Sequence, residues 1–347
     1  MLTTRALNRA TLARQLLLRR HPLSAEQAVT QLAGLQAQAP LAPYGGLHAR
    51  ISPYSATALS TLLAERSVVR AHLMRQTVHM VTAQDYVDFR PMFAHLGARD
   101  ISSYFAKDLA GADIAEVATV ALALLKGRTL TRTELGRHLA ERWPDAGPNA
   151  LAYTATSQLA VVQTPPRGLW GKTGQVTLAL AEDWLAPASP AAPITQSPPV
   201  TQSPPAPAPT SPGRPVERLL LRYLAAFGPA TVADAQTWSG LTRLREVADD
   251  LAGSLAKFRG EDGAELLDLP DAPRPDPDTP APPRFLPEYD NLLLSHADRT
   301  RVIPHGKPVP LPPGNGCAQG TLLIDGLWNA SWKIAREKDS ARLTVTP

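Results

Sequence analysis

Apolar residues recur along much of this chain at the three-to-four-residue spacing of an amphipathic helix. The pattern predicts helices over Leu7–Arg19, Ile114–Leu125 and Val216–Ala226. After each of them a further apolar helix opens with a hydroxyl residue three positions before a polar acceptor, in the pairs Ser24/Gln27, Thr131/Glu134 and Thr231/Asp234. The first two pairs are capping boxes and the third is close to one, so they mark helix N-termini. Additional amphipathic helices are predicted at Pro148–Leu159 and Leu241–Leu251.

Short β-branched runs follow these helices and predict strands. They lie at Val68–Leu73, Thr77–Thr82, Val161–Gln163, Gln175–Leu180, Glu265–Leu269 and Thr321–Ile324. Three helices followed by a hairpin is the plan of a winged-helix unit, a variant of the helix-turn-helix. The fold class predicted is mainly α with small β wings (α+β), in three tandem winged-helix units. A generic helical α+β protein is the alternative, because helix-turn-helix patterns also arise by chance.

Proline-rich segments divide the chain. Residues 186–215 contain TQSPP twice, and Pro270–Pro283 is a shorter stretch of the same kind. Dense proline removes backbone donors and favours extended polyproline II, which is typical of a semi-rigid linker; a ligand segment for an SH3-type domain is the alternative. The expected organisation is therefore unit 1 at 1–110, unit 2 at 111–185, the linker at 186–215, and unit 3 with C-terminal β elements at 216–347.

Composition narrows the chemistry. The chain has 347 residues with a formal net charge of +4, and its single cysteine, Cys317, allows neither an internal disulfide nor a thiolate zinc site. Neither a phosphate-binding loop nor a dinucleotide fingerprint is present, so no cofactor, no metal and no nucleotide are expected. No apolar run reaches the length of a membrane span and the N-terminus lacks the pattern of a signal peptide. A soluble, cytoplasmic protein is predicted.

Two glutamines, Gln36 and Gln38, stand where an apolar helix gives way to a loop rich in proline and glycine. A rigid turn can present an amide in a fixed direction, although spacing alone also fits a solvated loop. The following hairpin carries Arg70, Arg75 and His79, which suit a ribbon that contacts phosphates as well as a solvated edge. Further along, Asp290 and His296 lie near Arg299 and Arg301, but no nucleophile elbow is present, which argues against acyl transfer.

Four blocks of sequence, in this order, resemble the AlkZ-type (YcaQ-like) family of winged-helix DNA glycosylases. They are LQAQAPLAPYGGLHAR (Leu35–Arg50), VVRAHLMRQTVHMVTAQD (Val68–Asp85), FLPEYDNLLLSHADRTRVI (Phe285–Ile303) and TLLIDGLWNASWKI (Thr321–Ile334). The resemblance implies a concave shape that embraces DNA, with a glutamine-x-glutamine motif as the catalytic centre; here the motif is Gln36, Ala37 and Gln38. Candidate DNA contacts are Tyr44, Arg50, Arg70, Arg75, His79, Arg299 and Arg301, with a structural role equally open for Tyr44 and Arg50.

The function expected is that of a monofunctional DNA glycosylase which hydrolyses the N-glycosidic bond of cationic, N7-alkylated purines and unhooks interstrand crosslinks. Its partner would be double-stranded DNA containing such purines, bound by a monomer. No lysine lies near the glutamines to form a Schiff base, since the first is Lys107. A non-catalytic winged-helix DNA-binding protein, such as a transcriptional regulator, is the alternative. It would read bases through Asn149, Tyr153, Thr154 and Gln158 on the helix that begins at Pro148.

Overall fold

The computed structural model describes residues 1–186, 214–304 and 319–347. The first part of the chain forms α1 (Thr4–Arg14), α2 (Ala25–Gln31), β1 (Leu35–Gln36), α3 (Ala42–His48), α4 (Ala56–Ala64), β2 (Val68–His72), the 3-10 turn η1 (Met74–Gln76) and β3 (Val78–Thr82). A long helix, α5 (Ala83–Asp100), then continues into the π-helical turn η2 (Ile101–Phe105). Most of the proposed linker, residues 187–213, lies outside the described ranges, as does Cys317.

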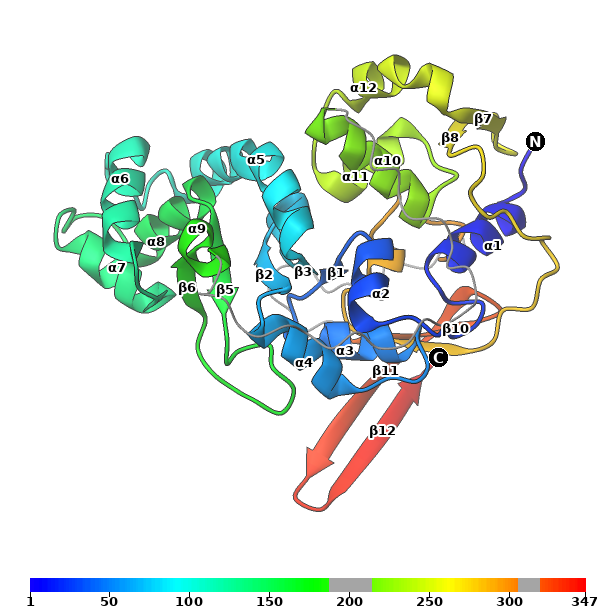
Figure 1. Ribbon diagram of the computed structural model, residues 1–347, viewed down its shortest axis with the longest axis horizontal. Coiled ribbons are helices and arrows are strands. Elements are labelled where there is room, and N and C mark those ends of the chain that lie inside the picture. The colour runs from blue at the N-terminus through cyan, green and yellow to red at the C-terminus, as the bar shows by residue number, and fades with distance from the viewer. Residues whose placement is uncertain (187–213, 305–318) are drawn as a thin grey trace.

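The next part consists of α6 (Ile114–Leu125), β4 (Leu130–Thr131), α7 (Arg132–Ala140), α8 (Pro148–Gln158), β5 (Val161–Thr164), β6 (Thr177–Leu180) and α9 (Ala181–Leu185). This second part shares a β-sheet with the first part. Its strands join β1 to β3 in one six-stranded sheet with the order β1-β3-β2-β5-β6-β4. The two parts meet where Arg70 of β2 pairs with Gln163 of β5. Figure 1 shows α6, α7 and α8 grouped at one end of the molecule, with this sheet leading toward its centre.

The third part starts with α10 (Pro215–Phe227), α11 (Val232–Ser239), α12 (Leu244–Asp250) and the 3-10 turn η3 (Ala252–Ser254). It continues with β7 (Ala256–Arg259), β8 (Glu265–Asp268), β9 (Arg284–Leu286), the 3-10 turn η4 (Asn291–Leu293), β10 (Gly320–Ile324), β11 (Leu327–Glu337) and β12 (Ser340–Thr346). The predicted strands at Glu265–Leu269 and Thr321–Ile324 both exist as β8 and β10. They lie in different sheets, since β8 pairs with β7 and β10 pairs with β9 and β11.

The predicted helix N-termini are confirmed. Ser24, Thr131 and Thr231 each accept a hydrogen bond from the backbone N–H three residues on, and Gln27, Glu134 and Asp234 complete three reciprocal capping boxes. The first helix is displaced from its expected range. It ends at Arg14 because Leu16 takes a left-handed conformation with φ 59°. Leu16 and Leu17 are then buried as loop residues instead of continuing the helical stripe.

Helix α1 makes buried contacts with the third part of the chain. Arg14, 1% exposed, makes two hydrogen bonds of 2.6 and 2.9 Å to the buried carboxylate of Asp268 on β8. The neighbouring Gln15 donates to the Ala226 carbonyl of α10 at 2.8 Å. On its other side the proline-rich stretch Pro270–Pro283 forms an irregular strap, as predicted, and Arg9 Nε donates to its Thr279 carbonyl at 2.7 Å. The fold is thus mixed α+β, as expected from the sequence, with one helix buried at the junction of its parts.

Candidate active site and nucleic-acid surface

The strand that carries the first glutamine is held against its neighbour by a glycine. β1 pairs antiparallel with β3, so that Gln36 lies opposite His79. Just before it, Gly34 has φ +90°, and a Cβ there would lie 2.6 Å from Val81 Cγ1. Only glycine combines this conformation with so close an approach of two backbones. The glutamine strand therefore sits directly on the hairpin that follows it in the sequence.

The amide of Gln36 is clamped by an arginine from the hairpin turn. Its side-chain oxygen accepts a hydrogen bond of 2.8 Å from Arg75 Nη2, and Arg75 Nη1 donates to the Trp238 carbonyl of α11. Because a guanidinium is only a donor, this contact fixes which end of the Gln36 amide is the oxygen. Burial, and then the nearby charge of Arg299, lowers the pKa of Arg75 to about 10, so it remains charged at neutral pH. Gln36 itself is 7% exposed.

Gln38 lies at the end of the strand and is exposed. Its side-chain oxygen accepts a hydrogen bond of 3.2 Å from the Val78 backbone N–H, while the Ala37 N–H donates to the Val78 carbonyl at 2.7 Å. The Ala37 carbonyl, which would otherwise receive the Val78 N–H, instead accepts from Arg70 Nη2 at 3.0 Å. The Gln38 side chain thus replaces a main-chain acceptor, and its oxygen too has a fixed direction.

His79 is a neutral, buried neighbour of these glutamines. It is 0% exposed, and its Nδ1 lies 2.9 Å from the Thr77 carbonyl. Since a carbonyl only accepts, Nδ1 carries the proton, and Nε2 is a buried acceptor without a hydrogen-bond partner among the described residues. Burial, followed by the charge of Arg75, lowers the pKa of His79 to about 3. A neutral imidazole at this depth does not contact phosphates as a cation.

Because His79 and the equally buried His296 are uncharged in the folded protein, we expect the free energy of unfolding to fall in mild acid. Burial is also the main cause that lowers the pKa of His296, well below its ordinary value. In the unfolded chain both histidines bind protons near pH 6.5, whereas in the folded chain they do not. The unfolded state therefore binds more protons, and the free energy of unfolding should fall as the pH drops below about 6.5, by up to about 1.4 kcal/mol per pH unit for each histidine.

Urea unfolding at several values between pH 7.5 and pH 5 measures this slope. The variant His79→Gln should flatten it, whereas the control His95→Gln should not, because His95 is exposed on α5. An unfolding free energy that stays constant over this range would contradict the assignment of neutral, buried imidazoles.

Three of the expected DNA contacts are interior residues. Tyr44 is 1% exposed and donates to the Gly168 carbonyl at 2.6 Å. Arg50 is 0% exposed and binds both carboxylate oxygens of Asp290 at 2.8 Å. Arg301, 5% exposed, donates to the Pro229 carbonyl at 2.8 Å. Their polar atoms are engaged inside the fold, which argues against direct contact of these three residues with DNA.

The remaining four expected contacts gather around the two glutamines. Arg75 holds Gln36, His79 lies opposite it, and Arg70 holds the Ala37 carbonyl between the glutamines. Arg299 is half-buried, donates to the His296 carbonyl at 3.2 Å, and lies close enough to Arg75 to lower its pKa. The structure thus brings together residues that are more than 200 positions apart in the sequence. Most of these contacts support the site from within.

The polar residues between Asp290 and Arg301 have structural roles in this chain. Asn291 Nδ2 donates to the Gly34 carbonyl at 3.0 Å, directly before the glutamine strand. His296, which suggested a catalytic dyad, bridges the Ser295 hydroxyl at 2.9 Å and the Phe227 carbonyl at 3.1 Å. The segment therefore buttresses the candidate site instead of supplying a nucleophile or a base.

One surface element escaped the sequence analysis. The β11–β12 hairpin projects beyond the body of the molecule (Figure 1) and pairs Ile334 with Leu343 and Trp332 with Val345. Ile334, Leu343 and Val345 are 51%, 52% and 41% exposed. The opposite face of the same strands carries Lys333 and Arg342 together with Ala335, Glu337, Ser340 and Thr344. The period-two alternation of apolar and polar residues along both strands and the Lys338-Asp339 turn were signals available in the sequence.

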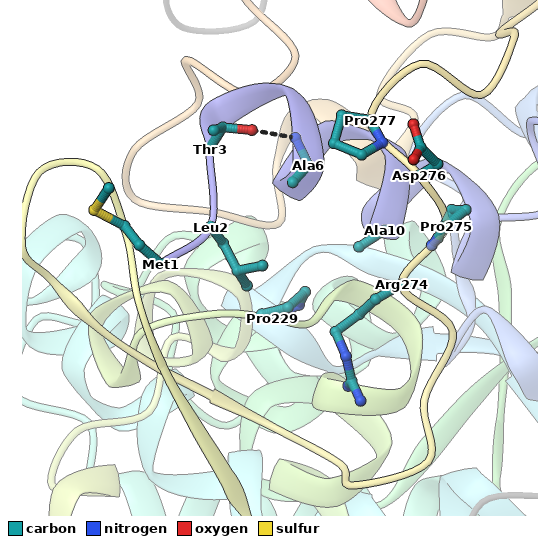
Figure 2. A pocket seen from close by; sticks show the side chains of 10 residues that line it. All are labelled: Met1, Leu2, Thr3, Ala6, Ala10, Pro229, Arg274, Pro275, Asp276 and Pro277. Carbon is teal, nitrogen blue, oxygen red and sulfur yellow. Dashed lines mark hydrogen bonds between the residues drawn. The ribbon is translucent and has the colours of Figure 1, made fainter.

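Other features of the described chain lie away from the glutamines. A cavity of about 280 Å³ lies between the start of α1 and the strap. Its lining residues, drawn in Figure 2, are Met1, Leu2, Thr3, Ala6, Ala10, Pro229, Arg274, Pro275, Asp276 and Pro277. Within residues 1–186, 214–304 and 319–347, no group of three or more His, Cys, Asp or Glu side chains is placed to hold a metal ion. No helix in these same ranges is long and apolar enough to cross a membrane.

Comparison with known proteins identifies the fold and the family of the chain. The structure of the Streptomyces sahachiroi DNA glycosylase AlkZ superposes with a TM-score of 0.70 over 100% of this chain and 91% of that chain, at 19% sequence identity, which shows a shared fold. A search of curated proteins finds no match. A family model described as DNA glycosylase AlkZ-like matches residues 29–347. Since that match spans nearly the whole sequence, the chain belongs to the AlkZ-like DNA glycosylase family.

Proposed function

We propose that this chain hydrolyses the N-glycosidic bond of cationic, N7-alkylated purines in double-stranded DNA, with Gln36 and Gln38 as its catalytic residues. The observation that carries the proposal is the fixed orientation of both amides. Each oxygen is engaged by a group that can only donate, Arg75 for Gln36 and the Val78 N–H for Gln38. An amide oxygen has two acceptor sites, so each retains one for a water molecule or for a developing positive charge.

Neutral amides suffice because the leaving group is already activated. Alkylation at N7 makes the purine cationic, so the base takes the electron pair of the breaking C1′–N9 bond and departs neutral. The remaining task is to hold a water molecule against C1′ and to stabilise the positive charge that develops on the sugar. After attack the surplus proton of the water passes to solvent, since an amide is not a base near neutral pH. Of the two residues, exposed Gln38 is better placed to meet this water, and clamped Gln36 to face the sugar.

Access to the site suits bulky lesions. Gln38 is exposed at the end of an edge strand. A purine with a large substituent, or one crosslinked to the opposite strand, is difficult to extrude into a closed pocket. The proposal therefore includes the unhooking of interstrand crosslinks, and one chain provides all residues that it requires. The projecting β11–β12 hairpin, with its exposed apolar stripe, is an element that can reach a DNA groove.

The organisation of the chain supports three tandem winged-helix units on a concave DNA-binding surface. The sequence α6, β4, α7, α8, β5, β6, with β4 paired to β6, follows the order of such a unit. So do α10, α11, α12, β7 and β8, where Ala230 bridges to Leu267 in place of the first strand. In the first part α2, α3 and α4 precede the β2–β3 hairpin. We place the units in 1–110, 111–185 and from 216 onward.

A purely DNA-binding regulator has less support. Of the four residues on α8 that would read bases, Thr154 is fully buried, and Tyr153 donates to Asp100 at 2.9 Å while stacking on Phe105. The Gln158 side-chain nitrogen is buried as well. Only Asn149 among the four is exposed. A helix so engaged in its own domain has few side chains left for a major groove.

The test is to incubate purified protein with a duplex that contains a single N7-methylguanine and to quantify abasic sites by strand cleavage after heating in alkali. Abasic sites should form without added metal or nucleotide, and the undamaged duplex should yield none. The rate should be independent of pH between 6 and 9, since burial holds the pKa of His79 at about 3 and that of His72 at about 4. Binding without any release of base would favour the regulator instead.

A further inference from the structure

A second cavity, of about 170 Å³, opens beside Gln38 on the junction between the first two parts of the chain. Its polar wall consists of Gln38, Arg70, His72, Arg132, Gln163 and Arg167, and the rest is Thr156 with aliphatic side chains. Gln38 lies two residues beyond β1, Arg70 and His72 lie on β2, and Gln163 lies on β5. Arg132 is the first residue of α7, and Arg167 lies in the loop after β5. We call this cavity the arginine pocket.

The arginine pocket holds three guanidinium groups and no carboxylate. Arg70 donates to the carbonyls of Ala37 and Arg167, and Arg167 donates to the Gly174 carbonyl at 3.1 Å. Arg132 lies over the Tyr153 ring, 5.6 Å from its centroid. Across the three described ranges, none of these arginines forms an ion pair with Asp or Glu. Three positive charges around one concavity are thus left without a counter-charge from the part of the chain that the structure describes.

One of the lining arginines, Arg70, also has an unpaired donor. Arg70 is 1% exposed, and its Nε is buried without a hydrogen-bond partner among the described residues. A buried guanidinium N–H normally has an acceptor, because leaving it unpaired is costly. The same positive charges affect a neighbouring histidine. Burial first, and then the charges of Arg132, Arg90 and Arg70, lower the pKa of His72. The three arginines that line the cavity, with no carboxylate beside them, point to an anion as its occupant.

We propose that the arginine pocket binds one backbone phosphate of the DNA strand that carries the lesion, adjacent to the sugar presented to Gln38. This inference rests on the proposed function. A cationic purine is excluded from the pocket by repulsion, whereas a phosphodiester is the anion that every nucleotide brings. Arginine is well suited to it, since its planar fork matches phosphate oxygens. Binding there fixes the distance between the strand and the two glutamines, which is the positioning that catalysis by neutral amides requires.

Two variants separate this subsite from general electrostatic attraction. The double variant Arg132→Gln/Arg167→Gln removes two charges from the pocket and leaves Arg70, which holds the Ala37 carbonyl, intact. The control Arg243→Gln/Arg245→Gln removes the same charge from exposed positions near α12, where both arginines pair with glutamates. Circular dichroism and thermal unfolding establish that each variant is folded before binding is measured.

Binding is measured on duplexes in which single phosphates around the lesion are replaced, one at a time, by neutral methylphosphonates. For the wild type and the control, a methylphosphonate at one particular position should weaken binding by about tenfold. The pocket variant should bind the unmodified duplex about tenfold more weakly, with no further loss at that position. Its slope of log K against log salt should be smaller by about 0.9, the contribution of one phosphate. Losses that add at every position, or a pocket variant that binds like the wild type, would overturn the subsite.

A titration with inorganic phosphate distinguishes a pocket that binds a phosphate of the DNA backbone from one that binds a free anion. The subsite holds the DNA backbone if two results are found together. Inorganic phosphate competes with DNA for the wild type but not for the pocket variant, and one methylphosphonate position weakens binding of the wild type but not of the pocket variant. If inorganic phosphate binds the pocket while no duplex position is coupled, the pocket serves a free anion and the proposal fails. Because binding is the readout, an absence of base release would refute the proposed function without deciding the fate of the pocket.

Discussion

Replacing Gln38 by alanine should lower the single-turnover rate of base release from an N7-methylguanine duplex by about 10²-fold, the usual effect of losing one preorganised polar group at a reacting centre. The folded state should hardly change. Gln38 is exposed, and the Val78 N–H that its oxygen accepts can be hydrated in its place. A free energy of unfolding within about 1 kcal/mol of the wild type is therefore expected.

Gln36→Ala should cause a similar loss of rate together with a loss of stability. Its oxygen is the acceptor for Arg75 Nη2, and Gln36 is only 7% exposed. Removing the acceptor leaves a buried guanidinium N–H unpaired, which costs about 1–3 kcal/mol. Single-turnover rates and urea unfolding of both variants measure the two effects separately.

The variant Arg75→Lys is a matched test of the clamp. It keeps the positive charge but loses the planar fork that reaches both Gln36 and the Trp238 carbonyl. The rate of release should fall while the affinity for undamaged duplex stays close to that of the wild type. If both alanine variants release base at the wild-type rate, the glutamines are not the catalytic residues, whatever the effect on stability.

Asp290→Ala should destabilise the protein by about 3–5 kcal/mol, because it strands the buried charge of Arg50. The pair is 0% and 4% exposed and makes two hydrogen bonds of 2.8 Å. Arg50 also donates to the carbonyls of Gln15 and Gly46, so it links the end of α1 to α3. The loss should appear as a lower midpoint of urea unfolding with an unchanged slope.

Two further variants define the origin of this effect. Arg50→Met/Asp290→Leu should recover much of the lost stability, since a buried ion pair contributes little net stability compared with well-packed apolar side chains. Glu246→Ala, which breaks the exposed pair with Arg243, should cost less than about 1 kcal/mol. A change below about 1 kcal/mol for Asp290→Ala would show that Arg50 is accessible to solvent and would restore it as a candidate DNA contact.

Much of the local structure was predictable because it depends on neighbours in the sequence. The three capping boxes pair residues that are three positions apart, so Ser24, Thr131 and Thr231 identified their helices correctly. The hairpin around Arg75 followed from β-branched runs on either side of a tight corner. By contrast the β11–β12 hairpin was not predicted, although apolar and polar residues alternate along both of its strands.

The role of each arginine was not predictable in this way. Arg50, Arg70, Arg75 and Arg301 look alike in the sequence, as charged residues within motifs. The structure pairs Arg50 with a carboxylate 240 positions away, joins Arg75 to Gln36 across 39 positions, and leaves Arg70 facing a cavity. An ion pair or a clamp of this kind requires the folded chain to bring distant segments together, and no local periodicity encodes which segments will meet.

The sequence by itself determined the helices α2, α6, α7, α8, α10, α11 and α12, the strands β2, β3, β5, β6, β8 and β10, and the two glutamines as the residues on which a catalytic hypothesis could be built. Only the tertiary structure decided that both amide oxygens are fixed by donors from the neighbouring hairpin, and that the segment around Asp290 supports them from behind. The physical reason is the range of the interactions. Capping and amphipathic periodicity act over a few residues, whereas the orientation of a neutral amide depends on partners that only the closed chain supplies.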